Sequence, residues 1–137
     1  MRTWIALLIA CSVAGAADAR PWQNAACNYT VDIPPGFSLS RHAGDRAVLQ
    51  EDRPIRTPLR IDVLCRPTAA NAAADWRKTS AGQIAYRVER RPAVGSGGAL
   101  WTITIFHPIT TVIGARQSEL GRPSFKPVWD LALSLRR

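Results

Sequence analysis

Hydrophobic and polar residues alternate most regularly in two stretches on either side of the glycine-rich loop 92–98. The hydrophobic positions of these stretches are Ile84, Tyr86, Val88, Trp101, Ile103 and Ile105. A period of two with β-branched and aromatic residues is typical of half-buried strands. The glycines of the loop permit the positive φ angles of a tight connection. The pattern predicts a β-hairpin over Gln83–His107, which we expect to form the centre of a sheet.

Shorter alternating runs predict further strands. They lie at 28–33, 37–40, 47–51, 59–66 and 109–113, with an irregular continuation at 115–120, and residues 20–26 are expected to be extended. Pro34-Pro35-Gly36 ends the first of these strands, because proline cannot donate to a strand ladder and glycine permits the turn.

Two segments favour helix instead. Thr68–Lys78 is rich in alanine, which has the highest helix propensity, and Thr68 is a suitable N-cap. Ser124–Arg137 has hydrophobic residues at helical spacing and Pro127 near its start. The order of elements predicts an α+β fold, a mainly antiparallel sheet with a short middle helix and a C-terminal helix packed on it. Three tryptophans are expected in its core: Trp76, Trp101 and Trp129.

Residues 1–19 have the features of a secretory signal peptide. Arg2 precedes a short apolar run, and Ala17-Asp18-Ala19 is a small-residue cleavage site. The run is roughly half of the 20 residues that a transmembrane anchor needs. We therefore expect a periplasmic or secreted protein that comprises one domain, residues 20–137. A lipoprotein signal at Leu8-Ile9-Ala10-Cys11, with Cys11 lipidated, is the alternative.

Cys27 and Cys65 are the two cysteines that follow the predicted signal peptide. In an oxidising compartment they are expected to form a disulfide, which would contribute about 4 kcal/mol on the chain-entropy estimate. Two buried thiols are the alternative. The pair lacks the C-x-x-C spacing of a redox or zinc site.

The chain carries 18 Lys and Arg against 10 Asp and Glu, a net charge of +8. Such an excess attracts anionic partners. Export and the lack of aromatics between the arginines argue against nucleic acid, so we expect an acidic protein partner. The alternative is an arginine-biased surface that is merely solvated. The residues expected to bind the partner are Arg41, Arg46, Arg53, Arg56, Arg60, Arg87, Arg90 and Arg91.

Three short motifs resemble the PsbP-like superfamily, which includes the DcrB-type periplasmic proteins. They are Ile33-Pro34-Pro35-Gly36-Phe37, Ala81-Gly82-Gln83-Ile84-Ala85 and the terminal segment 125–136. The resemblance implies an α/β/α sandwich used for binding and assembly rather than catalysis. Some immunity proteins that neutralise type VI secretion effectors are similar in size, export signal and architecture. The short, alanine-rich middle helix departs from the superfamily.

Residues suited to catalysis are few. A nucleophile needs a base within reach, and a set of Ser96, His107 and Asp62 would have to assemble from distant segments. His42 and its acidic neighbours lack the spacing of a metal site, and we expect no metal and no cofactor. We therefore expect a non-catalytic protein-binding module, in one version an immunity protein for a secreted toxin. A DcrB-like envelope assembly or uptake accessory protein is the alternative, and a small periplasmic hydrolase is the third hypothesis.

Overall fold

The computed structural model describes residues 18–53, 58–65, 75–80, 82–92, 98–107, 111–119 and 124–137. Most of the predicted signal peptide, Arg56 and Ser96 lie outside these residues. The described residues form a mainly-β fold with one helix. In chain order the elements are β1 (Arg20–Asn24), β2 (Tyr29–Ile33), β3 (Phe37–Ala43), β4 (Arg46–Glu51), β5 (Arg60–Leu64), β6 (Asp75–Thr79), β7 (Gly82–Pro92), β8 (Ala99–His107), β9 (Thr111–Glu119) and α1 (Lys126–Ser134).

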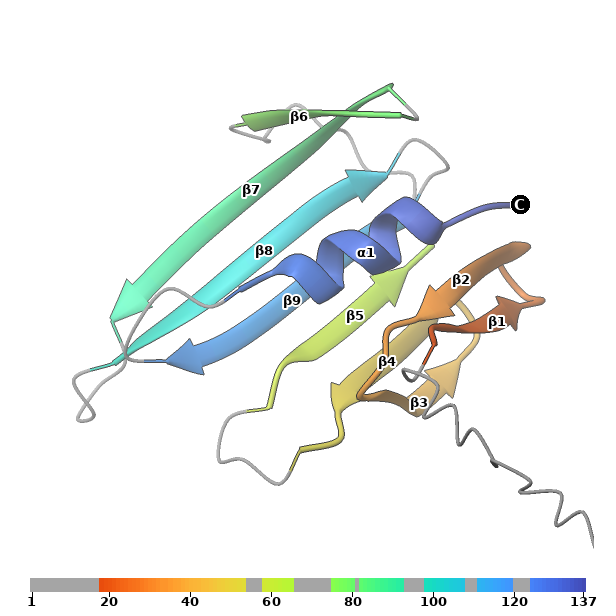
Figure 1. Cartoon of the computed structure of the whole chain (residues 1–137), viewed down its shortest axis with the longest axis horizontal. Helices are drawn as coiled ribbons and strands as arrows, with labels where there is room; N and C mark the ends of the chain where they lie inside the picture. The colour runs from red at the N-terminus through yellow and green to blue at the C-terminus, as the bar shows by residue number, and fades with distance from the viewer. Residues whose placement is uncertain are drawn as a thin grey trace, which may run out of the picture.

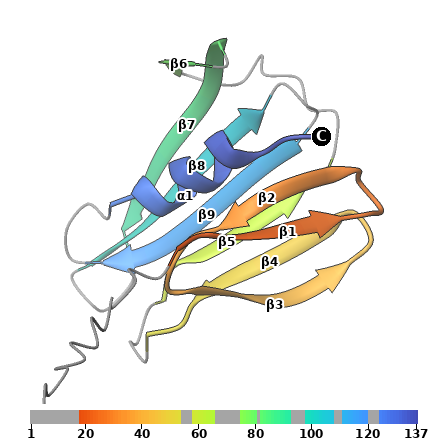
Figure 2. The same ribbon diagram turned by 45° about the vertical axis from the view of Figure 1, so that its right-hand side comes forward.

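Seven strands form one antiparallel sheet in the order β3-β4-β5-β9-β8-β7-β6, and β1 and β2 pair as a separate ribbon. Figures 1 and 2 show α1 and the β1–β2 ribbon on the same face of the sheet. The helix lies over β8 and β9, and the ribbon lies over the β3–β4–β5 side. We call this covered face the inner face and the opposite one the outer face.

The alternation along each strand decides which side chains form the core. In β5, Ile61 and Val63 are fully buried on the inner face, whereas Asp62 between them is partly exposed. Ile103 and Ile105 in β8 follow the same rule. A strand with one buried face shows this period of two. The strands predicted at 28–33, 37–40, 47–51 and 59–66 are therefore confirmed within a few residues at their ends. Of the predicted strand 109–113 and its continuation at 115–120, the described residues Thr111–Glu119 form a single strand, β9.

The predicted hairpin is confirmed as β7 and β8, which pair from Ala85 with Phe106 to Pro92 with Ala99. The hairpin is not the centre of the sheet, because β9 occupies the middle position and pairs with β5 on one side and β8 on the other. Strands that are far apart in sequence meet there. Local alternation carries no information about such a pairing.

The predicted middle helix is wrong where it can be compared, because residues 75–78 belong to strand β6; residues 66–74 lie outside the described ranges. Five residue pairs join β6 to β7, and Gly82 begins β7 with a φ of +111°. The ladder with β7 supplies backbone hydrogen bonds that outweigh a helix propensity carried mainly by the alanines upstream. As a result Trp76 is 60% exposed instead of buried.

The predicted C-terminal helix is confirmed as α1, with a proline in its first turn. Its apolar face consists of Val128, Trp129, Leu131 and Ala132, all of which join the core of the inner face. Of the other two tryptophans expected there, Trp101 is partly buried against the same core. Within the described residues, no helix has the length and apolar character needed to cross a membrane.

The β1–β2 ribbon is attached to the sheet by a disulfide. Cys27, in the turn between β1 and β2, is bonded to Cys65, which directly follows β5, and their Cα atoms are 6.1 Å apart. Near this bond the amide of the fully buried Asn24 donates to the hydroxyl of Tyr29 over 3.3 Å. Burial raises the pKa of the Tyr29 hydroxyl. The predicted bridge is present, and it is compatible with an extracellular or periplasmic protein.

The disulfide is expected to account for a large part of the stability. In a double variant, Cys27→Ala with Cys65→Ala, the free energy of unfolding should fall by about 4 kcal/mol, because the unfolded chain regains the entropy of an open loop. Urea unfolding followed by tryptophan fluorescence measures this change. Reduced wild-type protein is the control and should unfold at the same midpoint as the variant. An unchanged midpoint in both would contradict the expected contribution.

The two tryptophans Trp129 and Trp76 are expected to differ sharply in their contribution to folding. Trp129→Ala should lower the free energy of unfolding by about 3–5 kcal/mol, because it leaves a cavity between α1 and the sheet. Trp76→Ala, at an exposed position, should cost less than about 1 kcal/mol. The same urea titration compares the two variants. Equal losses would show that Trp76 is buried and that its placement on β6 is wrong.

Candidate binding surfaces

The outer face of the sheet carries most of the arginines that the sequence analysis selected. Arg60 is next to the inward Ile61 in β5 and therefore belongs to the outer face. Arg46 of β4 pairs in register with Leu64, which is on the same face of β5 as Arg60. Along β7, Arg87 and Arg91 belong to the outer face, whereas Val88 and Arg90 belong to the inner face. None of the described elements covers this face in Figures 1 and 2. The alternation of the strands therefore gathers these arginines on one open surface.

Of the other predicted arginines that the structure describes, one lies on the outer face and two do not. Arg41 pairs in register with Val48 after a bulge in β3 and belongs to the outer face. Arg90 lies on the inner side, with its guanidinium carbon 5.9 Å from the centre of the Trp101 ring. Arg53 follows β4 and forms an ion pair with Glu51. Of the eight arginines, the outer face holds Arg41, Arg46, Arg60, Arg87 and Arg91.

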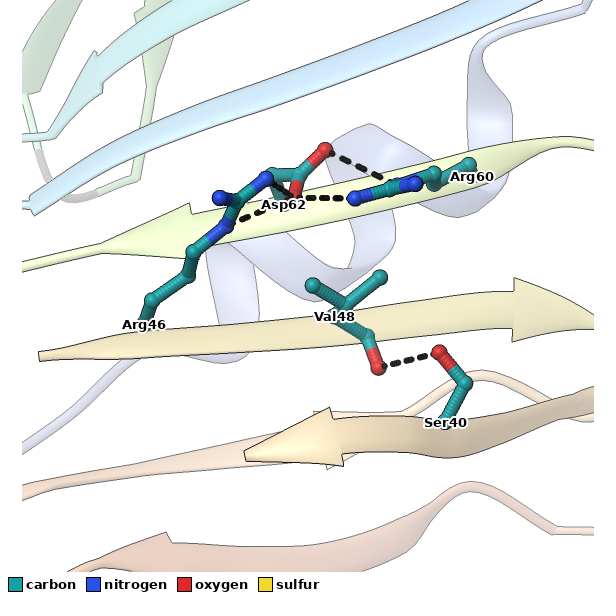
Figure 3. Close-up of polar contacts among 5 residues, drawn as sticks. All are labelled: Ser40, Arg46, Val48, Arg60 and Asp62. Carbon is teal, nitrogen blue, oxygen red and sulfur yellow. Dashed lines mark hydrogen bonds and ion pairs between the residues drawn. The ribbon is translucent and has the colours of Figure 1, made fainter. Parts of the chain in front are cut away.

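Asp62 organises the arginines on β4 and β5. Its Oδ1 accepts hydrogen bonds from Nε and Nη2 of Arg46 at 3.1 and 2.7 Å. Nη2 of Arg60 donates to the same oxygen over 3.4 Å, and Nε of Arg60 lies 3.4 Å from Oδ2. Figure 3 shows this carboxylate between the two guanidinium groups. One negative charge thus orders two arginines and leaves the group with a net positive charge.

Strand register extends the charged surface across the sheet. Asp62 pairs with Gly114, Gly114 with Thr104, and Thr104 with Arg87. Arg87 forms an ion pair with Glu89 on the same strand, with Nε and Oε1 3.4 Å apart. The three strand spacings between Asp62 and Arg87 amount to about 14 Å. Gly114 and Thr104 therefore lie between two charged groups on the outer face, Asp62 with its arginines and Arg87 with Glu89.

The charges of this face do not balance. Outside β9, its described residues carry two carboxylates, Asp62 and Glu89, against six cations, an excess of four positive charges. The cations are Arg41, Arg46, Arg60, Lys78, Arg87 and Arg91. Such a surface attracts anions at a distance and offers fork-shaped donors to carboxylates at contact.

An aromatic side chain lies at the edge of the same face. Trp76 pairs in register with Ala85, and Ala85 with Phe106, so the exposed indole belongs to the outer face. Tryptophan supplies much contact area at a small cost in side-chain entropy. Trp22, by contrast, is half-buried on the ribbon, with its ring centre 5.2 Å from that of His42. Trp76 is thus available as an anchor, whereas Trp22 is largely occupied.

His107 and Asp62, the two described members of the set considered for catalysis, do not come together. His107 follows the alternation of Ile103 and Ile105 and belongs to the inner side of β8, whereas Asp62 lies on the outer face and is bound by arginines. Burial lowers the pKa of His107 below its ordinary value. Within the described ranges, His, Cys, Asp and Glu form no group of three or more that could hold a metal ion.

A second surface, which no motif of the sequence predicts, is a groove beside α1 on the inner face. Its volume is about 430 Å³, and its walls include Tyr86, Val88 and Ile103 from the hairpin and Trp129 from the helix. The rings of Tyr86 and Trp129 meet edge to face, with their centres 5.2 Å apart. Hydrophobic periodicity marks these residues only as core. Whether a helix covers a whole sheet or part of it is not encoded in that pattern.

Comparison with known proteins adds information on the fold. Neither a protein-family model nor a curated protein matches the chain. A crystal structure of a protein from Bacteroides thetaiotaomicron VPI-5482 is similar, with a TM-score of 0.55 and 11% sequence identity. The match covers 79% of this chain and 44% of that protein, so the chain spans less than half of its structural neighbour. At this identity the likeness concerns the fold alone.

The Asp62 network is expected to support the arginines measurably. Asp62→Asn should lower the free energy of unfolding by about 1–2 kcal/mol, because Arg46 and Arg60 then lie side by side without a counter-charge. Urea unfolding measures the loss. Asp52→Asn is the matched control, because Asp52 is exposed and follows β4. The free energy of unfolding of this variant should equal that of the wild type. Equal effects of the two substitutions would contradict the network.

Proposed function

We propose that the protein is an exported, non-catalytic protein-binding module that docks an acidic partner on its outer face. The observation that supports this function is the excess of four positive charges on one uncovered sheet face, with its arginines on regular strands. The disulfide between Cys27 and Cys65 agrees with a partner in the same oxidising compartment. The PsbP-like resemblance, a superfamily used for binding and assembly, points the same way and is itself part of the proposal.

The arginines of this face suit carboxylates better than a diffuse positive surface would. A guanidinium holds its charge at all working pH values and forms two parallel hydrogen bonds to one carboxylate. Arg46 is already ordered by Asp62, so less side-chain entropy is lost when a partner binds beside it. A carboxylate of the partner would be the second anion, after Asp62, beside the two cations Arg46 and Arg60. Arg41 on β3 and Arg91 on β7 extend the positive surface beyond Arg46, Arg60 and Arg87.

A protein fits this face better than a nucleic acid does. Binders of single strands alternate cationic and aromatic side chains so that successive bases can stack. Among the described outer-face residues, Trp76 is the one large aromatic that is mostly exposed, and it lies at the edge strand. One aromatic anchor beside a charged, flat surface is instead the composition of many protein interfaces.

Immunity against a secreted toxin is the version of this function that we favour. Toxin hydrolases often concentrate carboxylates around their catalytic clefts, and an arginine-bearing surface that covers such a cleft would block the substrate. An envelope accessory role of the DcrB kind would use the same face for a different acidic protein. The identity of the captured partner separates the two versions.

The test is a pull-down with tagged mature protein from periplasmic and culture-supernatant fractions, washed at two salt concentrations and identified by mass spectrometry. Arg41→Glu and Arg91→Glu should each weaken capture of the partner about tenfold, and higher salt should weaken wild-type capture. The matched control is Arg90→Glu, with the same charge change one residue from Arg91 but on the inner side of β7.

Each result has a defined meaning. Loss of a near-stoichiometric secreted hydrolase with Arg91→Glu but not with Arg90→Glu would support immunity, and loss of an envelope-assembly protein would move the proposal to the accessory role. Equal capture of the partner by Arg91→Glu and by Arg90→Glu would show that the outer face does not bind it. A substrate turned over by the purified protein, and no longer turned over after His107→Ala, would contradict the non-catalytic assignment.

A further inference from the structure

The groove beside α1 lies on the opposite side of the sheet from the proposed protein interface. In Figures 1 and 2 the helix runs over β8 and β9 and leaves β7 and β6 beyond its edge. The space of about 430 Å³ at this edge has apolar and aromatic walls on the sheet side, and Leu133, which is 44% exposed, lies on the helix side. Small-molecule sites have this size and combine apolar walls with a few polar groups, which are here Arg77, Lys126 and Asp130.

Arg77 is the polar group that distinguishes this groove from an ordinary surface hollow. Its guanidinium carbon lies 4.4 Å from the centre of the Trp129 ring, so the flat cation is stacked on the indole. Stacking uses the face of the guanidinium and leaves its in-plane N–H donors free for a second contact. Among the described residues no carboxylate pairs with Arg77. Arg77 lines the groove, so these donors are available to a ligand there.

The other charges of the lining cancel. Nζ of Lys126 lies 2.6 Å from Oδ2 of Asp130, one turn further along α1. Of the charged residues around the groove, Arg77 thus retains an uncompensated positive charge. A neutral apolar ligand would leave this cation unmatched, and a cationic ligand would be repelled. A ligand with an apolar body and one carboxylate matches both the walls and the charge.

We propose that the groove between α1 and β6–β8 binds a small organic acid with an apolar body, with its carboxylate on the in-plane donors of Arg77. The apolar body contacts Tyr86, Val88 and Leu133. Two parallel hydrogen bonds to the guanidinium fix the orientation of the carboxylate. This binding activity is independent of the proposed protein partner, because the two surfaces are on opposite faces of the sheet.

The test is a titration of the ¹⁵N-labelled mature protein with octanoate, followed by two-dimensional NMR and by calorimetry. Octanoate should shift the backbone amides of Tyr86, Val88 and Leu133, and octanol, which has the same chain without the charge, should bind at least about tenfold more weakly. Arg77→Gln should weaken octanoate binding about tenfold or more, and Arg77→Lys should weaken it less, because lysine keeps the charge without the fork.

The matched control is Arg90→Gln, which removes an arginine stacked on a different tryptophan, Trp101, outside the groove. Its octanoate affinity should equal that of the wild type. Arg77 lies at an exposed position of β6, and an unchanged spectrum of the ligand-free variant verifies its fold. The proposal is overturned by equal affinities for octanoate and octanol, by equal losses in Arg77→Gln and Arg90→Gln, or by the absence of binding at millimolar octanoate.

Discussion

The insertion of β9 between β5 and β8 is the contact on which the rest of the architecture depends. On one side β9 pairs with the last strand of the β3–β4–β5 meander, and on the other it pairs with the β7–β8 hairpin. Two locally formed units thereby become one sheet of seven strands. The ladders on both sides of β9 satisfy its backbone groups, which would otherwise have to remain hydrated. Both surfaces described above require this continuous sheet.

A sheet of this width has more inner surface than one short helix can cover. The inner face is therefore closed by two elements, α1 over the middle and the β1–β2 ribbon over one side, and the disulfide joins the ribbon to the end of β5. An isolated antiparallel β-bridge between Thr30 of β2 and Arg136, which follows α1, connects the two covering elements. The side that carries β6 and β7 receives only the edge of α1, and the groove lies there because the cover ends.

The two faces of the sheet thus differ in chemistry for a common reason. In β5 and β8, alternation sends every second residue to the core and leaves the others on the outer face, where arginine, threonine and acidic side chains meet across strands. Asp62 can order Arg46 and Arg60 because β4 and β5 are neighbours. Arg87 lies on the same surface, although β9 and β8 separate its strand, β7, from β5. The broad charged outer face results from the pairing of the strands. The groove that Arg77 lines results from the incomplete cover of the inner face by α1.

The amino-acid sequence by itself determined most of the strands, the hairpin, the C-terminal helix and the cysteine pair. Alternation, helical spacing and turn residues are local and survive in a single chain. Tertiary structure decided the order of the strands, the conversion of residues 75–78 from predicted helix to β6, and the exposure of Trp76. It also decided that five of the eight selected arginines share one face, that Arg90 lies on the other, and that Tyr86 and Trp129 border a groove. These outcomes depend on which distant segments pair and on where the covering elements end, and long-range contacts of that kind leave no periodic signal in the chain.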